Sequence, residues 1–296
     1  KEIILVLWKS KLKIILLSFI ALILGIIIAL QLPNIYKSQS LLTPSSYADG
    51  GISGLSSQYS GLASMAGISL PSSGSSNSVE SAIAIMKSLS FFELLVNKHN
   101  LFFSLQAAKG WDASTDSLIV DPKKFDTKSN KWVSKQPFSS DGRPSIQSAH
   151  RDFLEQFNAS LNKKTGFVSI SFDHFSPFIA KEIVDIVVIE INELSRTNDM
   201  VIAREAISFL EQEINQTNLK DVRSVINSLI QRQIEKVTLA NVSTQYLLKT
   251  LSSPSVPELK SEPRRAAVVI LFSIIGFIAS CSFILVRFFL DKFNSR

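Results

Sequence analysis

The chain has 296 residues, of which 46% are hydrophobic and 19% charged, and its formal net charge is +6. A mean hydropathy of +0.22 excludes an intrinsically disordered chain. The positive excess lies mostly in the two tails, 1–13 and 287–296, and the rest of the chain has 24 basic and 23 acidic residues. That balance excludes a basic face for nucleic acid, so we expect no nucleic-acid partner.

The first predicted element is a transmembrane helix over residues 14–32. No charge stands between Lys13 and Lys37, and 19 helical residues extend roughly 28 Å, the thickness of a bilayer core. A signal peptide would have a shorter apolar core and a small-x-small cleavage site, whereas this run ends in QLPN at 31–34. The absence of Met at position 1 indicates that the N-terminus was trimmed.

A short strand is expected at residues 36–43, followed by a stretch at 45–78 that is rich in Gly and Ser. No Gly-Lys-Ser/Thr sequence follows these glycines, which excludes a phosphate loop. Two interpretations stay open for the stretch: a mobile loop, or a loop that orders against a neighbouring subunit. Its apolar anchors would be Leu62, Met65, Ile68 and Leu70.

Two helices and a strand are expected in the next hundred residues. Ser78 is a suitable N-cap for a helix over 79–98, and a second helix is expected over 145–161. Residues 165–173 alternate between apolar and polar side chains with the period of a half-buried strand.

The segment 108–144 between these helices is polar and rich in turns, and it contains Trp111 and Trp132. Exposed Trp faces stack on sugars, whereas buried ones pack within a core. The sequence favours packing and leaves the contact with a glycan as the alternative.

A long helix is predicted over about 177–216. Ser176 and Pro177 provide an N-cap and a first-turn proline, and forty residues form a rod of roughly 60 Å. The returning helix, about 221–242 with Asp221 as its cap, has only half that length, so the apolar stripe of the rod needs other subunits to cover it. The candidate oligomer contacts are Ile183, Val187, Leu194, Ile202 and Leu210.

The last elements return the chain to the membrane. A strand at 244–251 is expected to pair with the one after the first span. A stiff Pro-rich connector follows at 254–265, and a second transmembrane helix spans 266–286. Gly276 in this helix permits close approach, either to Gly25 of the first span or to another subunit.

The basic tails indicate that both termini are cytoplasmic. The domain over residues 33–265 is then expected on the other side of the inner membrane, in the periplasm of a Gram-negative cell. Arg264 and Arg265 lie on that side within a long loop, where the positive-inside rule has little force.

Residues that could carry catalysis or bind a metal are few and scattered. The single cysteine, Cys281, lies in the second apolar run, which excludes an intrachain disulfide and a thiolate metal site. The three histidines show no metal-ligand spacing, and the acidic residues of 112–126 form no paired-carboxylate arrangement. We therefore expect no catalytic residue, no cofactor and no metal ion.

The order of elements and the residues around the second span resemble the Wzz-type polysaccharide co-polymerases, the O-antigen chain-length determinant family. That family's motif is roughly P-x2-P-x4-S-P-K-x11-G-G-x2-G. The residues that match it are Pro254, Pro257, Pro263, Arg264 and Gly276. Glu262, Phe277 and Ser280 depart from it, and the segment 221–242 resembles the family's returning helix.

The resemblance implies both fold and function. The implied fold is an α+β membrane protein in which two transmembrane helices flank a periplasmic α/β base domain with a long extended helical hairpin. Members of the family are not enzymes. As ring-like homo-oligomers in the lipid bilayer, they set the modal length of the O-antigen of lipopolysaccharide together with an integral-membrane polymerase. The lipid-linked glycan is a further expected partner.

Three alternatives differ from an O-antigen regulator. An adaptor for polymerisation or export would serve capsule, exopolysaccharide or a glycan like the enterobacterial common antigen. A periplasmic sensor hairpin would need a cytoplasmic signalling module, and ten residues after Val286 do not supply one, nor the kinase of larger relatives. A glycan hydrolase would need a nucleophile or a carboxylate pair, and we find neither.

Overall fold

A computed structural model describes residues 8, 11–45, 75–133, 142–217 and 219–294. The chain divides into two compact units. The helix pair comprises Lys1–Tyr36 with Leu259–Arg296, and the central domain comprises Lys37–Glu258. The four apolar anchors expected in the Gly- and Ser-rich stretch lie outside the described residues.

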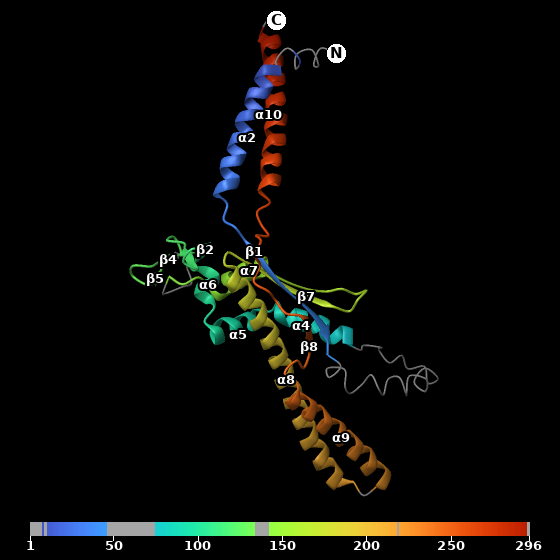
Figure 1. Ribbon diagram of the computed structural model, residues 1–296. Coiled ribbons are helices and arrows are strands. Elements are labelled where there is room, and N and C mark those ends of the chain that lie inside the picture. Colours follow the sequence, from blue (N-terminus) through green and yellow to red (C-terminus); the bar gives the residue numbers. More distant parts are fainter. Residues whose placement is uncertain (1–7, 9–10, 46–74, 134–141, 218, 295–296) are drawn as a thin grey trace, which may run out of the picture. The chain divides into compact units, whose positions relative to one another are not determined.

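The helix pair contains the two long apolar helices that the sequence predicts. They are α2 (Lys11–Gln31) and α10 (Arg265–Asn294), and they run side by side (Figure 1). Segments Ile14–Gln31 and Arg265–Arg287 are long and apolar enough to cross a membrane, and only 17% and 11% of them are buried. Such exposure is unlike the core helix of a soluble protein, where an apolar surface would be covered.

Four strands among the described residues form one sheet with the order β6-β7-β1-β8. Their bounds are β1 Tyr36–Pro44, β6 Phe157–Leu161, β7 Val168–His174 and β8 Leu248–Ser252. The expected pairing of the strand after the first span with the last strand is confirmed, and it is antiparallel: Thr43 opposes Lys249, and Pro44 opposes Leu248. The last strand begins at Leu248, so the prediction of a strand from residue 244 is wrong for residues 244–247.

Helices and two small hairpins complete the central domain (Figure 1). The helices before α8 are α4 (Ser75–Met86), α5 (Leu89–His99), α6 (Phe102–Gln106) and α7 (Ile146–Gln156). The hairpins pair β2 (Ala108–Asp112) with β3 (Ser117–Val120), and β4 (Phe125–Asp126) with β5 (Lys131–Trp132). The core forms where apolar side chains of α5, α7, β7 and the first half of α8 meet. Its members include Phe91, Phe92, Leu95, Phe153, Ile170, Phe172, Val184 and Ile191.

The prediction of one helix over 79–98 is wrong, because the chain breaks into α4 and α5. Ser88 is the N-cap of α5, and its Oγ accepts a hydrogen bond from Phe91 N at 3.2 Å. The freed carbonyl of Lys87 bonds to Nε2 of His150 at 2.9 Å, a contact from α7. Ser78, the expected N-cap, lies inside α4.

The prediction of a helix over 145–161 is wrong for its last five residues, 157–161. The helix α7 ends at Gln156, and residues 157–161 form β6, which pairs with β7. Phe157 and Ala159 are buried while Asn158 and Ser160 are exposed. This period of two fits the pleat of a strand.

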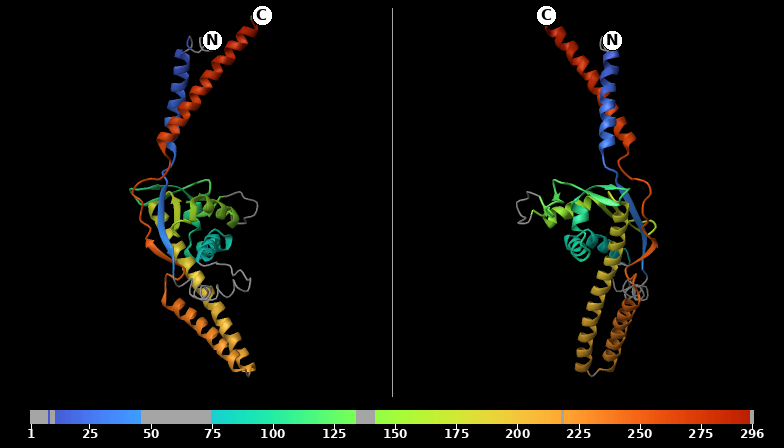
Figure 2. Two further views of the ribbon diagram at one scale, coloured as in Figure 1. Left: turned by 90° about the vertical axis from the view of Figure 1, so that its right-hand side faces the viewer. Right: turned by 60° about the vertical axis from the view of Figure 1, so that its left-hand side comes forward.

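The long helix is confirmed as α8, Pro177–Gln216, with Ser176 as its N-cap and Pro177 in the first turn. Its partner α9 spans Lys220–Val242. The expected cap at Asp221 is wrong, because the N-cap position is Leu219 and makes no side-chain hydrogen bond. The two helices form a hairpin that leads away from the sheet (Figures 1 and 2).

The base of this hairpin is held by polar contacts with Asp199. The hydroxyl of Tyr246, a buried residue, donates to Asp199 Oδ2 at 2.8 Å, and Lys236 Nζ lies 3.2 Å from Asp199 Oδ1. Burial, together with this hydrogen bond and the adjacent carboxylate, raises the pKa of Tyr246. These contacts tie α8, α9 and the segment before β8 together.

A buried carboxylate joins α5 to α8. Glu190, with 4% of its side chain exposed, lies 2.8 Å from Lys98 Nζ and 2.9 Å from His99 Nε2. Burial would raise the pKa of Glu190, but hydrogen bonds and charge from Lys98 and His99 outweigh burial and lower the pKa. A carboxylate with a lowered pKa stabilises the fold above its ordinary value of 4.5, and this stabilisation is lost as the pH falls below it.

His174 gives the fold a separate sensitivity to mild acid. Its ring is buried, Nδ1 accepts from Ser176 N at 3.1 Å, and Nε2 lies 3.1 Å from the carbonyl oxygen of Ser104. Only a neutral ring with its proton on Nε2 makes both bonds. Burial lowers the pKa of His174, although the bonds with Ser104 and Ser176 oppose that shift.

We therefore expect the free energy of unfolding to fall as the pH drops below 6.5, the ordinary pKa of histidine. Below this pH the His174 ring binds a proton in the unfolded state but stays neutral in the folded state. A His174→Gln variant has no ring to titrate and should lose this dependence between pH 7 and 5.5. Chemical unfolding of the detergent-solubilised chain at several pH values would measure this dependence. If the free energy of unfolding changed equally with pH in both proteins, the assignment to His174 would be contradicted.

Candidate functional site

The polar groups of the described residues include no candidate metal centre. In the described part of the chain, no group of three or more His, Cys, Asp or Glu residues could hold a metal ion. The candidate functional features are two surfaces: the connector with the helix pair, and the α8–α9 hairpin.

The connector is extended and lies against the chain near β1. Ser38 Oγ donates to the Ser255 carbonyl oxygen at 2.9 Å, and Ser40 Oγ donates to that of Ser252 at 2.9 Å. Closer to α10, Ile35 N donates to the Glu262 oxygen at 2.9 Å, and Ser261 N donates to the Ile35 oxygen at 2.8 Å. The segments that leave α2 and enter α10 are thus bonded to each other.

The residues of the Pro-rich motif differ in their environments. Pro254 is buried, Pro257 and Pro263 are half-buried, and Arg264 is exposed. The next residue, Arg265, donates from Nη2 to Asn34 Oδ1 at 3.1 Å. The two adjacent arginines therefore have separate roles: Arg265 bonds to the segment that leaves α2, and Arg264 faces outward.

The two apolar helices approach closely at small residues. A Cβ atom added at Gly276 would lie 2.3 Å from Ala21 Cβ, and one added at Gly25 would lie 2.7 Å from Phe272 Cβ. Gly276 therefore approaches the first span within the chain, but at Ala21 and not at Gly25, the residue that the sequence suggested.

A serine contact adds to this packing. Ser280 is fully buried, and its Oγ lies 3.3 Å from Ser18 Oγ. Sequence reasoning missed Ser18, Ala21 and Ser280 as contact residues. The available signal was the small-xxx-small spacing of Ala21 with Gly25 and of Gly276 with Ser280.

The five candidate oligomer contacts on α8 do not share one environment. Ile183 and Val187 are buried in the core of the central domain, at 1% and 0% exposure. Expecting them on an exposed face was wrong, because the first half of α8 packs on the sheet. Leu194 and Leu210 are half-buried, and Ile202 is 51% exposed.

The hairpin nevertheless exposes many apolar side chains beyond the core. They belong to both α8 and α9, so this surface is not confined to the predicted stripe. They are Val201, Ile202, Phe209, Val222, Val225, Leu229, Ile234 and Val242. We call this set the hairpin patch.

Comparison with known proteins gives one family and several solved structures. Residues 1–99 match the family model for Wzz, described as chain length determinant protein. No curated protein matches the chain. A full-length bacterial polysaccharide co-polymerase is similar at 14% identity, with 99% of this chain and 98% of that chain covered and a TM-score of 0.41.

A second solved structure is a fragment of WzzB, a polysaccharide co-polymerase from Salmonella Typhimurium. It is 11% identical, with 77% of this chain and 100% of that chain covered and a TM-score of 0.34. The resemblance to the Wzz chain-length determinant family, predicted from the spans and the Pro-rich connector, is confirmed by the family match over residues 1–99.

Proposed function

We propose that this chain is a non-enzymatic regulator of polysaccharide chain length that sets the modal length of the O-antigen of lipopolysaccharide. The observation that carries the proposal is the match of residues 1–99 to the chain length determinant family. The two long apolar helices support anchorage in the inner membrane. The basic tails support cytoplasmic termini, with the central domain in the periplasm.

The protein acts as a ring-like homo-oligomer together with an integral-membrane polymerase. The hairpin patch supports the oligomer, since exposed apolar side chains gathered on one element mark contact surfaces. Covering them would gain about 25 cal/mol for each Å² removed from water. The membrane-proximal residues Pro254, Pro257, Pro263, Arg264 and Gly276 form the region nearest to a membrane-embedded polymerase and to a lipid-linked glycan.

Charged substitutions in the hairpin patch test the oligomer. Ile202 and Phe209 lie two helical turns apart on α8 and are 51% and 60% exposed. Ile202→Glu with Phe209→Glu should shift the detergent-solubilised protein to smaller species in light scattering. Ile119→Glu is the matched control, because Ile119 is also 51% exposed but lies on β3. If the double variant and the Ile119→Glu control shifted the oligomer equally, a specific contact through the hairpin patch would be contradicted.

The function itself is tested by the length profile of surface glycan on a gel. A strain that lacks the protein should give a featureless ladder, and restoring the protein should give a cluster at one length. The Ile202→Glu, Phe209→Glu protein should fail to restore the cluster, and Ile119→Glu should restore it. If the O-antigen profile did not change when the protein was lost and restored, the O-antigen assignment would be overturned in favour of a capsule or exopolysaccharide adaptor.

A further inference from the structure

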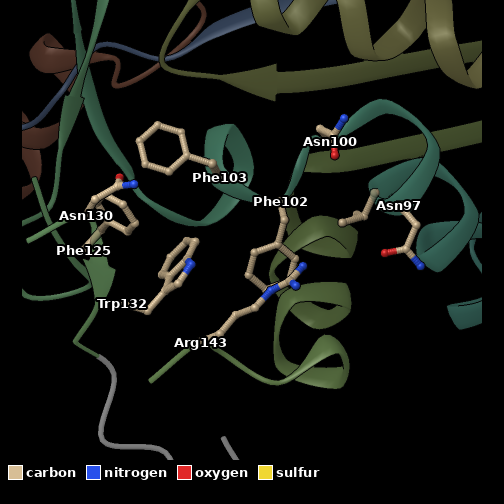
Figure 3. A pocket seen from close by; sticks show the side chains of 9 residues that line it. Asn97, Asn100, Phe102, Phe103, Phe125, Asn130, Trp132 and Arg143 are labelled. Carbon is tan, nitrogen blue, oxygen red and sulfur yellow. The ribbon is translucent and has the colours of Figure 1, made fainter. Parts of the chain in front are cut away.

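The central domain contains a pocket that the regulatory role does not explain. It has a volume of about 430 Å³ and is formed by the end of α5, α6, the β4–β5 hairpin and the segment before α7 (Figure 3). Pockets for small ligands have volumes of about 300–1,000 Å³. Separate pieces of the chain, from residue 96 to residue 143, contribute to its lining.

Aromatic rings form one side of this pocket (Figure 3). Trp132 contacts Phe125 edge to face, with ring centroids 5.2 Å apart, and Phe103 packs on Phe125 at 5.0 Å. Phe125 is buried, Trp132 is half-buried, and Phe103 is 40% exposed. Packing against the buried Phe125 thus holds the cluster in place, while its exposed part, including Phe103, remains accessible to a ligand.

Polar side chains form the rest of the lining. Asn97, Asn100 and Asn130 line the pocket, and so does Arg143, whose Cζ lies 3.7 Å from the centre of the Phe102 ring. Within the described residues, these three amides and the guanidinium make no hydrogen bond to protein. Donors and acceptors beside an aromatic surface are therefore available to a ligand.

Backbone geometry explains part of this composition. Asn100 and Asn130 have φ values of 54° and 53°, which asparagine tolerates better than most residues. That requirement accounts for the residue type at two positions. It does not account for Asn97 or Arg143, which line the same pocket.

We propose that this pocket binds a sugar unit of a polysaccharide, preferentially an acidic one. The apolar face of a pyranose ring packs on an aromatic side chain, and its hydroxyls bond to amides. Arg143 is the charged residue of the lining, and no acidic residue among the described ones lines the pocket, which favours a carboxylated sugar. The inference rests on the proposed function for the identity of the polymer, and it adds a glycan-binding site to the regulator.

Binding can be measured on the full chain in detergent by isothermal titration. Three probes suffice: a neutral hexose hexasaccharide, a hexasaccharide of alternating hexuronic acid and N-acetylhexosamine, and fragments of the surface polysaccharide of the strain that makes the protein. We expect at least one to bind, and acidic probes to bind more tightly. No heat from any probe at millimolar concentration would overturn the proposal.

Substitutions assign the binding to this pocket. Trp132→Ala should weaken it at least tenfold, and Trp132→Phe, which retains an aromatic ring, should weaken it less. Trp111→Ala is the matched control, because Trp111 is also half-buried but pairs with Phe178 and donates to Asp116. Arg143→Gln should reduce affinity for an acidic probe about fivefold and leave a neutral probe unaffected. Equal losses from Trp111→Ala and Trp132→Ala would overturn the assignment.

The outcomes separate this inference from the proposed function. If the protein restores a modal glycan length in cells but binds no probe, the pocket proposal fails and the regulator stands. If it binds a probe through Trp132 but leaves the glycan profile unchanged, the regulator fails and the binding site stands.

Discussion

Gly276→Leu is expected to force α2 and α10 apart and to reduce the population of the state in which they are paired about tenfold. Even a Cβ at this position would lie 2.3 Å from Ala21 Cβ, and the backbone Cα atoms of Ala21 and Ser18 would lie 3.7 and 3.8 Å away. Overpacking of a tight contact costs about 1–3 kcal/mol, and 1.4 kcal/mol is a factor of ten in population. None of these three atoms belongs to a flexible side chain that could make room.

Disulfide trapping measures this separation. In a Cys281→Ser background, Ser18→Cys with Ser280→Cys should crosslink readily, because the two serine oxygens lie 3.3 Å apart. Adding Gly276→Leu should lower the crosslinked fraction, and the modal glycan length should be lost with it. Ala279→Leu is the control, because Ala279 is exposed on the same helix. An undiminished crosslink in Gly276→Leu would show that the helices accommodate the larger side chain.

Elements encoded by local periodicity could be predicted from the sequence. The two apolar runs, the strand after the first span and the helix that begins at Pro177 each depend on neighbours within a few residues. The start of α8 could be predicted from two adjacent residues, the N-cap Ser176 and Pro177, although the helix is 40 residues long.

Elements that depend on partners distant in the sequence could not be predicted from the sequence. The break before α5 looks helical in sequence, but it is stabilised by the Ser88 cap and by His150, 63 positions from Lys87. The strand β6 exists because β7 pairs with it. Burial of Ile183 and Val187 likewise requires knowing that the first half of α8 covers the sheet.

The candidate sites follow the same division. The Pro-rich motif and Gly276 can be identified from spacing alone, since they lie within 23 residues of one another. The pocket cannot, because Asn97, Phe125 and Arg143 come from separate segments whose juxtaposition depends on the fold. Trp132 was singled out by its residue type, and only its surroundings distinguish it from Trp111.

Asn192→Ala is expected to destabilise the central domain by about 3 kcal/mol and to release β8. Asn192 is 2% exposed, and its Oδ1 accepts from Leu247 N at 2.8 Å and from Leu248 N at 2.9 Å. Its Nδ2 donates to the carbonyl oxygens of Val188 and Leu248. The substitution leaves two buried backbone N–H groups without an acceptor, and each such group costs about 1–3 kcal/mol.

The same chain offers a matched control and a local readout. Asn215 also donates from Nδ2 to a carbonyl four residues earlier on α8, that of Glu211, but it is exposed. Asn215→Ala should therefore change stability by no more than about 0.5 kcal/mol. Hydrogen exchange of the peptide that covers residues 244–252 should accelerate in Asn192→Ala and not in Asn215→Ala. Because β8 leads directly into the connector, unchanged exchange in both variants would mean that backbone pairing with β1 alone holds this edge of the sheet.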